Sequence, residues 1–300
     1  MRGRRCGVGA LARLVGLVVA CGVTAASLVT LGWWAVGAPQ ATGAVWLQVT
    51  RFGSAQNNAP VPDRPFFFLA ILTDDAGLAD GIHVIGVNPQ LRKATILDVS
   101  YDTQAYTGGK IDEAGASQGL TAQVDAISRL VGVPIDYAIR TDYPGYVAMI
   151  NEIGGIDINV AQPMHDQYSG SDFDPGPQHV NGDQALSFGR DRYSFPTADL
   201  QRTQNGGLLV LAALATLQGR HGSFGDLVHW IAALGRHIEL DNLSIVDLFH
   251  LGGLALSIDP TNIRNVLLPV GQGPGTILVP TPDAKSLLAD FADDAVLENH

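Results

Sequence analysis

The chain of 300 residues is 46% hydrophobic and 16% charged, and its formal net charge is −11. Because duplex nucleic acid attracts basic surfaces, so acidic a composition argues against a DNA-binding regulator. The two cysteines, Cys6 and Cys21, both lie near the N-terminus. The remainder of the chain therefore has no disulfide, and it is long enough to be stabilised by its own hydrophobic core.

The N-terminus has the pattern of a membrane anchor. Four arginines stand within residues 1–13, and residues 14–36 then run without a charged side chain. That length crosses ~30 Å of hydrocarbon as a helix, and the preceding arginines favour a cytoplasmic position for residues 1–13. We therefore expect a single-pass protein of the cell membrane with its C-terminal domain on the extracytoplasmic side. A cleaved signal peptide and a lipoprotein signal at Cys21 are the alternatives.

Residues 37–61 are rich in small and polar side chains, which predicts a linker, and the folded part is expected to begin at residue 62. Strand-like and helix-like segments then alternate, as is typical of an α/β domain with a central mixed sheet covered by helices. We expect this domain over 62–220 and an α/β part over 221–300 that completes or extends it. The expected strands are 66–72, 83–87, 95–99, 136–140, 156–160, 263–270 and 276–279, and the expected helices are 119–131, 144–153, 199–218, 224–238, 243–257 and 283–297.

The helix expected over 199–218, with Asp199 as its cap, carries a stripe of leucines. A leucine stripe on a helix packs in the core or lines a lipid pocket, and the sequence leaves both interpretations open. The stripe consists of Leu208, Leu209, Leu211 and Leu214.

Carboxylates flank the first two expected strands. Asp74 and Asp75 follow the first strand, and Asp80 precedes the second. A short connection between the strands brings Asp74 and Asp80 to one sheet edge, where two carboxylates suit Mg²⁺. The alternative is that this acidic segment is a solvated turn.

A group of arginines follows further along the chain. Arg190 and Arg192 are expected to project from one side of an extended segment, and Arg202 from the first turns of the next helix. Planar guanidinium groups make bidentate, charge-assisted hydrogen bonds, so this trio is suited to gripping a pyrophosphate. A surface network of arginine and aspartate is the alternative.

Six sequence blocks occur in order between about residues 65 and 217. They are Leu78–Pro89 (LADGIHVIGVNP), Gly132–Tyr137 (GVPIDY), Gly154–Val160 (GGIDINV), Pro163–Asp166 (PMHD), Gly176–Leu186 (GPQHVNGDQAL) and Arg190–Arg192 (RDR). In order and spacing they resemble the LytR-CpsA-Psr family of cell-envelope proteins, particularly its actinobacterial members.

This resemblance implies an extracytoplasmic α/β domain with an apolar pocket for a polyprenyl chain and a mouth where Mg²⁺ and arginines hold a pyrophosphate. The implied reaction is phosphotransfer of a glycopolymer from its polyprenyl-pyrophosphate carrier to a cell-wall acceptor such as peptidoglycan. By the resemblance, Asp74 and Asp80 are metal ligands and Asp102 is catalytic. Arg190, Arg192 and Arg202 match catalytic, phosphate-binding arginines, and Tyr101 and Gln204 stand at further pyrophosphate-binding positions.

The chain departs from the family pattern at five of its positions. Each hydrogen bond to a charged group contributes ~1.5–3 kcal/mol, so the loss of several arginines is expected to weaken or abolish turnover. One hypothesis is therefore a transferase, and the other is a homologue that binds polyprenyl phosphate or wall polymer as a scaffold or regulator. Ala76, Leu78, Tyr101 and Gln204 replace arginines, and Gly206 replaces a glutamine.

Overall fold

The computed structural model describes residues 62–220 and 224–297. The predicted cytoplasmic tail 1–13, membrane span 14–36 and linker 37–61 lie outside these ranges. Within them, no helix is long and apolar enough to cross a membrane.

A six-stranded sheet forms the centre of the described part, in the order β10-β3-β2-β1-β4-β9. Strands β1 and β4 are parallel, as are β10 and β3, whereas the other neighbours are antiparallel. The prediction of a mixed central sheet in an α/β domain is thus confirmed. The strands are β1 (Phe66–Thr73), β2 (Ala79–Asn88), β3 (Lys93–Asp98), β4 (Tyr137–Asp142), β9 (Glu239–Asp241) and β10 (Ile263–Leu267).

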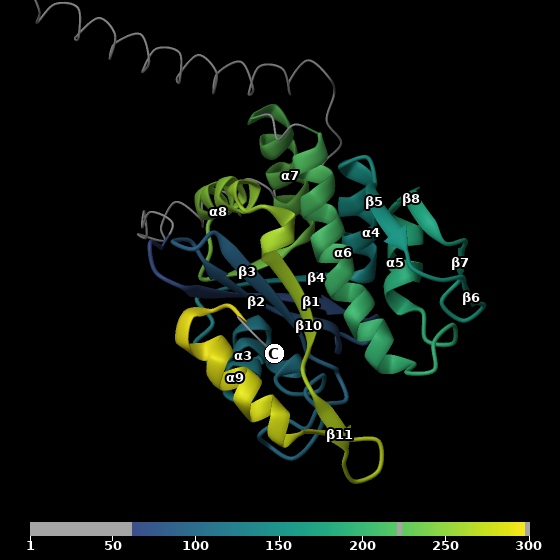
Figure 1. Cartoon of the computed structure of the whole chain (residues 1–300), viewed down its shortest axis with the longest axis vertical. Helices are drawn as coiled ribbons and strands as arrows, with labels where there is room; N and C mark the ends of the chain where they lie inside the picture. The colour runs from purple at the N-terminus through teal and green to yellow at the C-terminus, as the bar shows by residue number, and fades with distance from the viewer. Residues whose placement is uncertain (1–61, 221–223, 298–300) are drawn as a thin grey trace, which may run out of the picture. The chain divides into compact units, whose positions relative to one another are not determined.

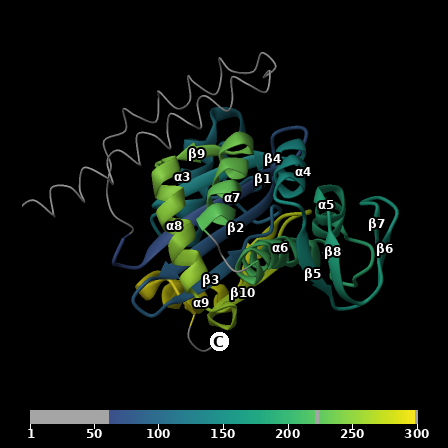
Figure 2. The same ribbon diagram turned by 90° about the horizontal axis from the view of Figure 1, so that it is seen from above.

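Helices cover both faces of this sheet (Figures 1 and 2). One face is covered by α3 (Leu120–Val131) and α9 (Pro282–Asp294), and the other by α6 (Asp199–Gly219), α7 (Phe224–His237) and α8 (Ile245–Ser257). Helix α5 (Gly182–Arg190) lies beside α6, and α4 (Tyr143–Glu152) lies beside α5 and α7. Short elements complete the fold: β5 (Ile156–Val160) with β8 (Gly176–Val180), β6 (Met164–Asp166) with β7 (Ser171–Phe173), β11 (Val270–Gln272) with β12 (Leu278–Pro280), and the 3-10 turns η1 (Ala116–Gln118) and η2 (Pro260–Asn262).

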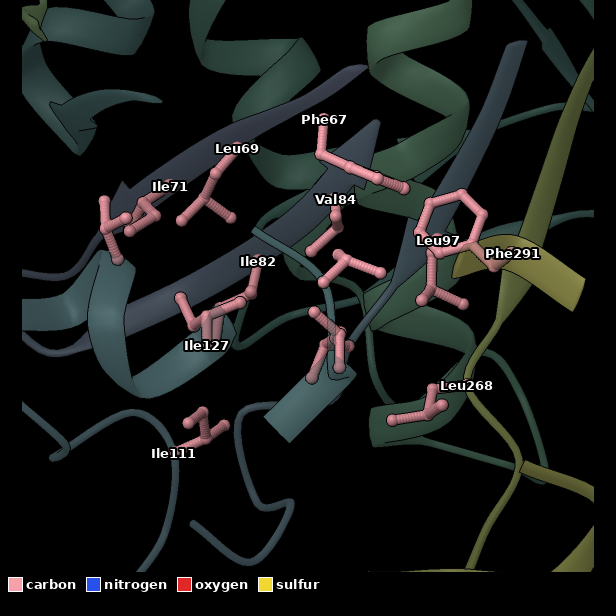
Figure 3. Packing of buried hydrophobic residues seen from close by; sticks show 14 of the residues in the cluster. Phe67, Leu69, Ile71, Ile82, Val84, Leu97, Ile111, Ile127, Leu268 and Phe291 are labelled. Carbon is pink, nitrogen blue, oxygen red and sulfur yellow. The ribbon is translucent and has the colours of Figure 1, made fainter. Parts of the chain in front are cut away.

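The face under α3 and α9 is closely packed (Figure 3). Side chains of a strand alternate between faces, so Phe67 and Leu69 enter this cluster while Phe68 points to the opposite face. The end of α9 approaches β2 closely at Gly86, where a Cβ would lie 2.1 Å from the Ala295 carbonyl oxygen. Only glycine fits there. This face is therefore a filled core.

Three local predictions need correction. The expected strand 263–270 is two strands, β10 and β11, because Pro269 lacks the N–H that a continuous ladder needs. Arg190 ends helix α5 instead of lying in an extended segment, since Asn181 and Gln184 form a capping box that starts a helix. The N-cap residue of helix α6 is Ala198 and not the predicted Asp199. The partners of the Asp199 carboxylate are described below.

Candidate functional site

Asp80 owes its position to an irregularity between β1 and β2. Leu72 pairs with Gly81 and Thr73 with Ala79, so Asp80 is an extra residue in the ladder. Such a bulge bends the strand and redirects a side chain. As a result Asp80, together with Gly81, lines a cavity on the helix α6 side of the sheet.

Arg202 in the first turns of α6 is the partner of Asp80. Its Nη1 forms an ion pair with the Asp80 carboxylate, and its Nη2 donates to the Asp80 backbone oxygen at 3.2 Å. The other Asp80 oxygen accepts a hydrogen bond from the Tyr143 hydroxyl at 2.6 Å. Since the Arg202 side chain is only 3% exposed, this buried pair joins β2 to α6 at the mouth of the cavity.

Arg190 differs from Arg192 and Arg202 because, among the described residues, its guanidinium has no acidic partner. The group lies 4.7 Å above the Tyr143 ring, and within the described residues no hydrogen bond or ion pair engages it. Arg190 lines both the cavity beside Asp80 and an adjoining polar cavity. Its charge is thus available to an anion.

Arg192 and Tyr101 share the Asp199 carboxylate. Arg192 Nε lies 2.8 Å from Asp199 Oδ1, and the Tyr101 hydroxyl donates to the same oxygen at 3.2 Å. Arg192 Nη2 in turn donates to the Tyr101 hydroxyl oxygen at 3.1 Å, and Arg202 lies 4.4 Å from the ring centroid. Burial, together with the charge of Asp199, raises the pKa of Tyr101, which therefore remains a neutral hydrogen-bonding group.

Two adjoining cavities make up the candidate site. The first, of about 250 Å³, is lined mainly by apolar side chains, and Asp80, Arg190 and Arg202 are among its polar lining residues. The polar cavity, of about 200 Å³, shares these three residues. It is lined by Asp80, Tyr143, Asp166, Tyr168, Ser169, Arg190, Arg192, Tyr193 and Arg202.

A further apolar cavity of about 280 Å³ adjoins the first, between the sheet and helices α6 to α8. The two share Phe68, Ile85, Val210 and Leu234 as lining residues. All of the residues that line this further cavity are apolar or glycine. The apolar space on this side of the sheet thus extends beyond the cavity that the arginines line.

The four leucines of the α6 stripe have different surroundings. Leu209 is buried in a hydrophobic cluster and lines the first cavity. Leu211 and Leu214 line the further cavity, whereas Leu208 is exposed. Three of the four leucines thus line an apolar cavity, and Leu209 is also part of the core.

Four predicted site residues line none of these cavities: Asp74, Tyr101, Asp102 and Gln204. Asp102 is paired with Lys110, and its backbone oxygen accepts from the Leu278 N–H at 2.9 Å. Gln204 lines none of the three cavities. Successive residues of a helix are rotated by about 100°, and in this part of α6 the residues that line the first cavity are Arg202, Thr203 and Gly206. The Gln204 backbone oxygen accepts from Asn265.

Asp74 and Asp80 do not form a ready Mg²⁺ site. Asp74 Oδ1 accepts the backbone N–H groups of Ala76 and Leu78, each at 2.9 Å, as expected for a turn. The Asp80 oxygens already bind Arg202 and Tyr143, so a metal ion would share the carboxylate with these groups or displace one of them. Among the residues described, no cluster of three or more His, Cys, Asp or Glu side chains is placed to hold a metal. The cation beside Asp80 is Arg202.

A buried polar cluster beside the first cavity was missed in the sequence. His83 and Asp98 stand opposite each other on β2 and β3, with His83 Nδ1 2.7 Å from Asp98 Oδ1. A Cβ on Gly206 would lie 2.7 Å from His83, and one on Gly207 2.2 Å from Asp98, so α6 packs here only through glycine. Burial raises the pKa of Asp98 to about 6. The sequence contained two signals for this cluster. They are polar residues inside apolar strands and a Gly-Gly pair inside a helix.

Solved structures share this fold. A crystal structure of Bacillus subtilis TagV matches with a TM-score of 0.65 and 21% identity, covering 78% of this chain and 99% of that one. The LytR-Csp2A-Psr enzyme from Actinomyces oris matches with a TM-score of 0.64, also at 21% identity, over 78% and 97% of the two chains. At these identities the likeness concerns the fold alone.

Curated relatives are distant and match over part of their length. The polyisoprenyl-teichoic acid–peptidoglycan teichoic acid transferase TagU of Bacillus mycoides is 31% identical over 134 residues, which cover 43% of each chain. The cell wall biosynthesis protein LcpA of Corynebacterium glutamicum is 26% identical over 52% of this chain and 29% of its own. The chain thus spans about half the length of the TagU proteins it matches.

A family model matches residues 68–284, which include the arginines and all of the sheet except the first two residues of β1. The mixed sheet and the cavity that opens beside Arg190 agree with what the sequence blocks implied. The chain belongs to the LytR_cpsA_psr family.

Proposed function

We propose that this protein binds a polyprenyl-pyrophosphate-linked glycopolymer and transfers its phosphoglycosyl part to a hydroxyl of a cell-wall acceptor such as peptidoglycan. The observation that carries the proposal is a mostly apolar cavity lined at its polar part by Arg190, for which the described residues supply no acidic partner. An amphiphile with a long hydrocarbon chain and an anionic head matches these two features. The distant TagU relatives are transferases of teichoic acid to peptidoglycan, which supports the same class of reaction.

In the proposed reaction, the acceptor oxygen bonds to the phosphorus that carries the sugar. The bond between this phosphorus and the bridging oxygen breaks, polyprenyl phosphate leaves, and the acceptor proton passes to water. The role of the protein is to position the reactants and to balance the charge of the phosphates. Arg190 faces the polar cavity and Arg192 stands beside it, whereas the buried Arg202 holds Asp80 in place.

The predicted anchor fits this proposal. A helix at 14–36 followed by a linker at 37–61, roughly 25–30 Å across as a flexible coil, would keep the domain close to the extracytoplasmic bilayer surface. A polyprenyl carrier is confined to that surface. We include this single-pass, extracytoplasmic placement in the proposal.

A transfer assay tests the proposal. The full chain in detergent is incubated with a polyprenyl-diphosphate oligosaccharide and a peptidoglycan fragment, and the release of polyprenyl phosphate is measured. Arg190→Ala is expected to lower the rate by about 10²–10³, the usual effect of losing one charge-stabilising donor. Arg129→Ala is the matched control, because Arg129 also lies over a tyrosine, at 5.1 Å from the Tyr106 ring, away from the cavities. Equal rates in both variants and the wild type would refute the assigned site.

A second candidate is a protein that binds the lipid without turning it over. The observation that favours it is that Arg192 and Arg202 already pair with Asp199 and Asp80, while Tyr101 between them adds no positive charge. In that case the wild type binds the lipid and releases no polyprenyl phosphate. A Leu78→Arg/Tyr101→Arg variant that gains release would then identify the missing charge as the cause.

A further inference from the structure

Two exposed tyrosines stand at the rim of the polar cavity. Tyr168 is 73% exposed and Tyr193 is 69% exposed, yet their ring centroids lie only 5.0 Å apart, with the planes inclined by 45°. Both line the polar cavity together with Arg190 and Arg192. A pair of exposed aromatic rings beside a polar cavity offers an apolar surface to a ligand that enters the cavity.

A buried carboxylate holds the first ring in place. Asp166, at the end of β6, is 2% exposed, and its Oδ1 accepts the backbone N–H of Tyr168 at 2.9 Å. Its Oδ2 accepts the backbone N–H of Arg192 at 3.1 Å. The turn that carries Tyr168 is thereby joined to the segment that carries Tyr193.

A second buried carboxylate holds the other ring. Asp191 is fully buried, and its oxygens accept the backbone N–H of Ser194 at 3.0 Å and the Ser194 hydroxyl at 2.7 Å. The Ser171 hydroxyl, at the start of β7, donates to the same carboxylate. Buried carboxylates thus hold both turns in place while the rings face solvent. Because the rings are already ordered, less conformational entropy is lost when a ligand binds.

We propose that Tyr168 and Tyr193 form a stacking platform for a pyranose ring next to the phosphate-binding arginines. The inference rests on the proposed function, in which the group beyond the phosphates, on the side away from the lipid, is a sugar. One face of a pyranose presents C–H groups that pack on an aromatic ring, while its hydroxyls keep their water. Tyrosine suits this contact because it offers a rigid apolar face and a polar tip. We assign the platform to the first sugar of the donor.

The test compares two lipids with the same prenyl chain, a prenyl diphosphate and the same compound carrying one N-acetylhexosamine. Their dissociation constants for the full chain in detergent are measured by calorimetry. The wild type is expected to bind the sugar-bearing lipid about tenfold more tightly, as for one stacked ring. Tyr168→Ala/Tyr193→Ala is expected to lose this preference and to keep its affinity for the bare diphosphate.

Two variants separate stacking from damage to the fold. Tyr168→Phe/Tyr193→Phe keeps the rings and is expected to keep the preference. Tyr106→Ala removes another tyrosine that is 73% exposed, outside the cavities, and is expected to change neither affinity. If the alanine pair instead weakens only the binding of a phosphate-free peptidoglycan disaccharide, the platform holds the acceptor sugar, and the donor assignment is overturned.

The remaining outcomes distinguish the two proposals. A wild type that binds both lipids equally, or an alanine pair that keeps the preference, overturns the platform and leaves the proposed function standing. A wild type that binds neither lipid overturns the proposed function itself.

Discussion

The two faces of the central sheet differ in how they are filled. Under α3 and α9, side chains such as Leu69 and Phe291 are completely buried in one packed cluster. On the opposite face, α6 to α8 leave two apolar cavities of about 250 and 280 Å³. Because protein interiors are normally close-packed, the hollow face indicates a binding function and the filled face supplies stability.

Two adjacent phenylalanines give the largest contrast between the faces. Phe67→Ala is expected to lower the free energy of unfolding by about 3–5 kcal/mol, because its ring lies in the packed cluster. Phe68→Ala is expected to cost clearly less, since its ring already borders both apolar cavities. Denaturant unfolding of the full chain in detergent measures both. Equal losses would show that the second face is filled in solution.

Two glycines of α6 test how closely the helix covers the hollow face. Gly207→Ala is expected to destabilise the protein by about 1–3 kcal/mol, because the new Cβ would lie 2.2 Å from both Asp98 and Asn265. Gly219→Ala, at the end of the same helix, meets no atom within 4 Å and is expected to be neutral or slightly stabilising. Thermal unfolding compares the pair. A tolerated Gly207→Ala would mean that α6 lies further from β3.

The Asp98 carboxyl gives the hollow face a pH dependence. Its pKa is raised by burial to about 6 in the folded protein and is near 3.8 when unfolded. Between these values the folded state binds more protons, so the contribution of Asp98 to stability is greatest below pH 4 and is lost as the pH rises through 6. Relative to Asp98→Asn, the wild type is expected to lose about 1–3 kcal/mol between pH 4 and pH 7. The free energy of unfolding is measured with denaturant at both pH values. The same difference between the wild type and Asp98→Asn at pH 4 and at pH 7 would contradict this.

Removal of divalent metal is expected to have the smallest effect. Asp80 is bonded to Arg202 and Tyr143, so its charge is balanced without a metal ion. Adding a chelator is therefore expected to change the dissociation constant of a prenyl diphosphate by less than about twofold, a free energy below 0.5 kcal/mol. A much larger loss, restored by Mg²⁺, would show that the ion displaces Arg202 from Asp80.

The sequence predicted the sheet and the large helices well. Strands such as Phe66–Thr73 and helices such as Leu120–Val131 have strong apolar patterns and end within a few residues of their expected bounds. Helix α5 was missed because its apolar residues are few, although the capping box of Asn181 and Gln184 marked its start.

The candidate site was predictable only in part. The motif placed Arg190 and Arg192 beside the polar cavity, but the direction of Asp80 depends on a bulge that no local pattern specifies. Asp102 is held by Lys110, a tertiary contact that its sequence neighbours did not indicate. The His83–Asp98 pair needs the strand register, and the tyrosine pair at the rim needs two loops to meet.

The most direct test of the hollow face as a lipid-phosphate site is a comparison of two ligands of equal chain length. Dissociation constants of a prenyl diphosphate and the matching prenyl alcohol are measured for the wild type and for Arg190→Ala. We expect the wild type to prefer the diphosphate by about 10- to 100-fold, and Arg190→Ala to lose most of that preference while it binds the alcohol unchanged. An unchanged preference in Arg190→Ala, or no binding of either ligand by the wild type, would contradict the account.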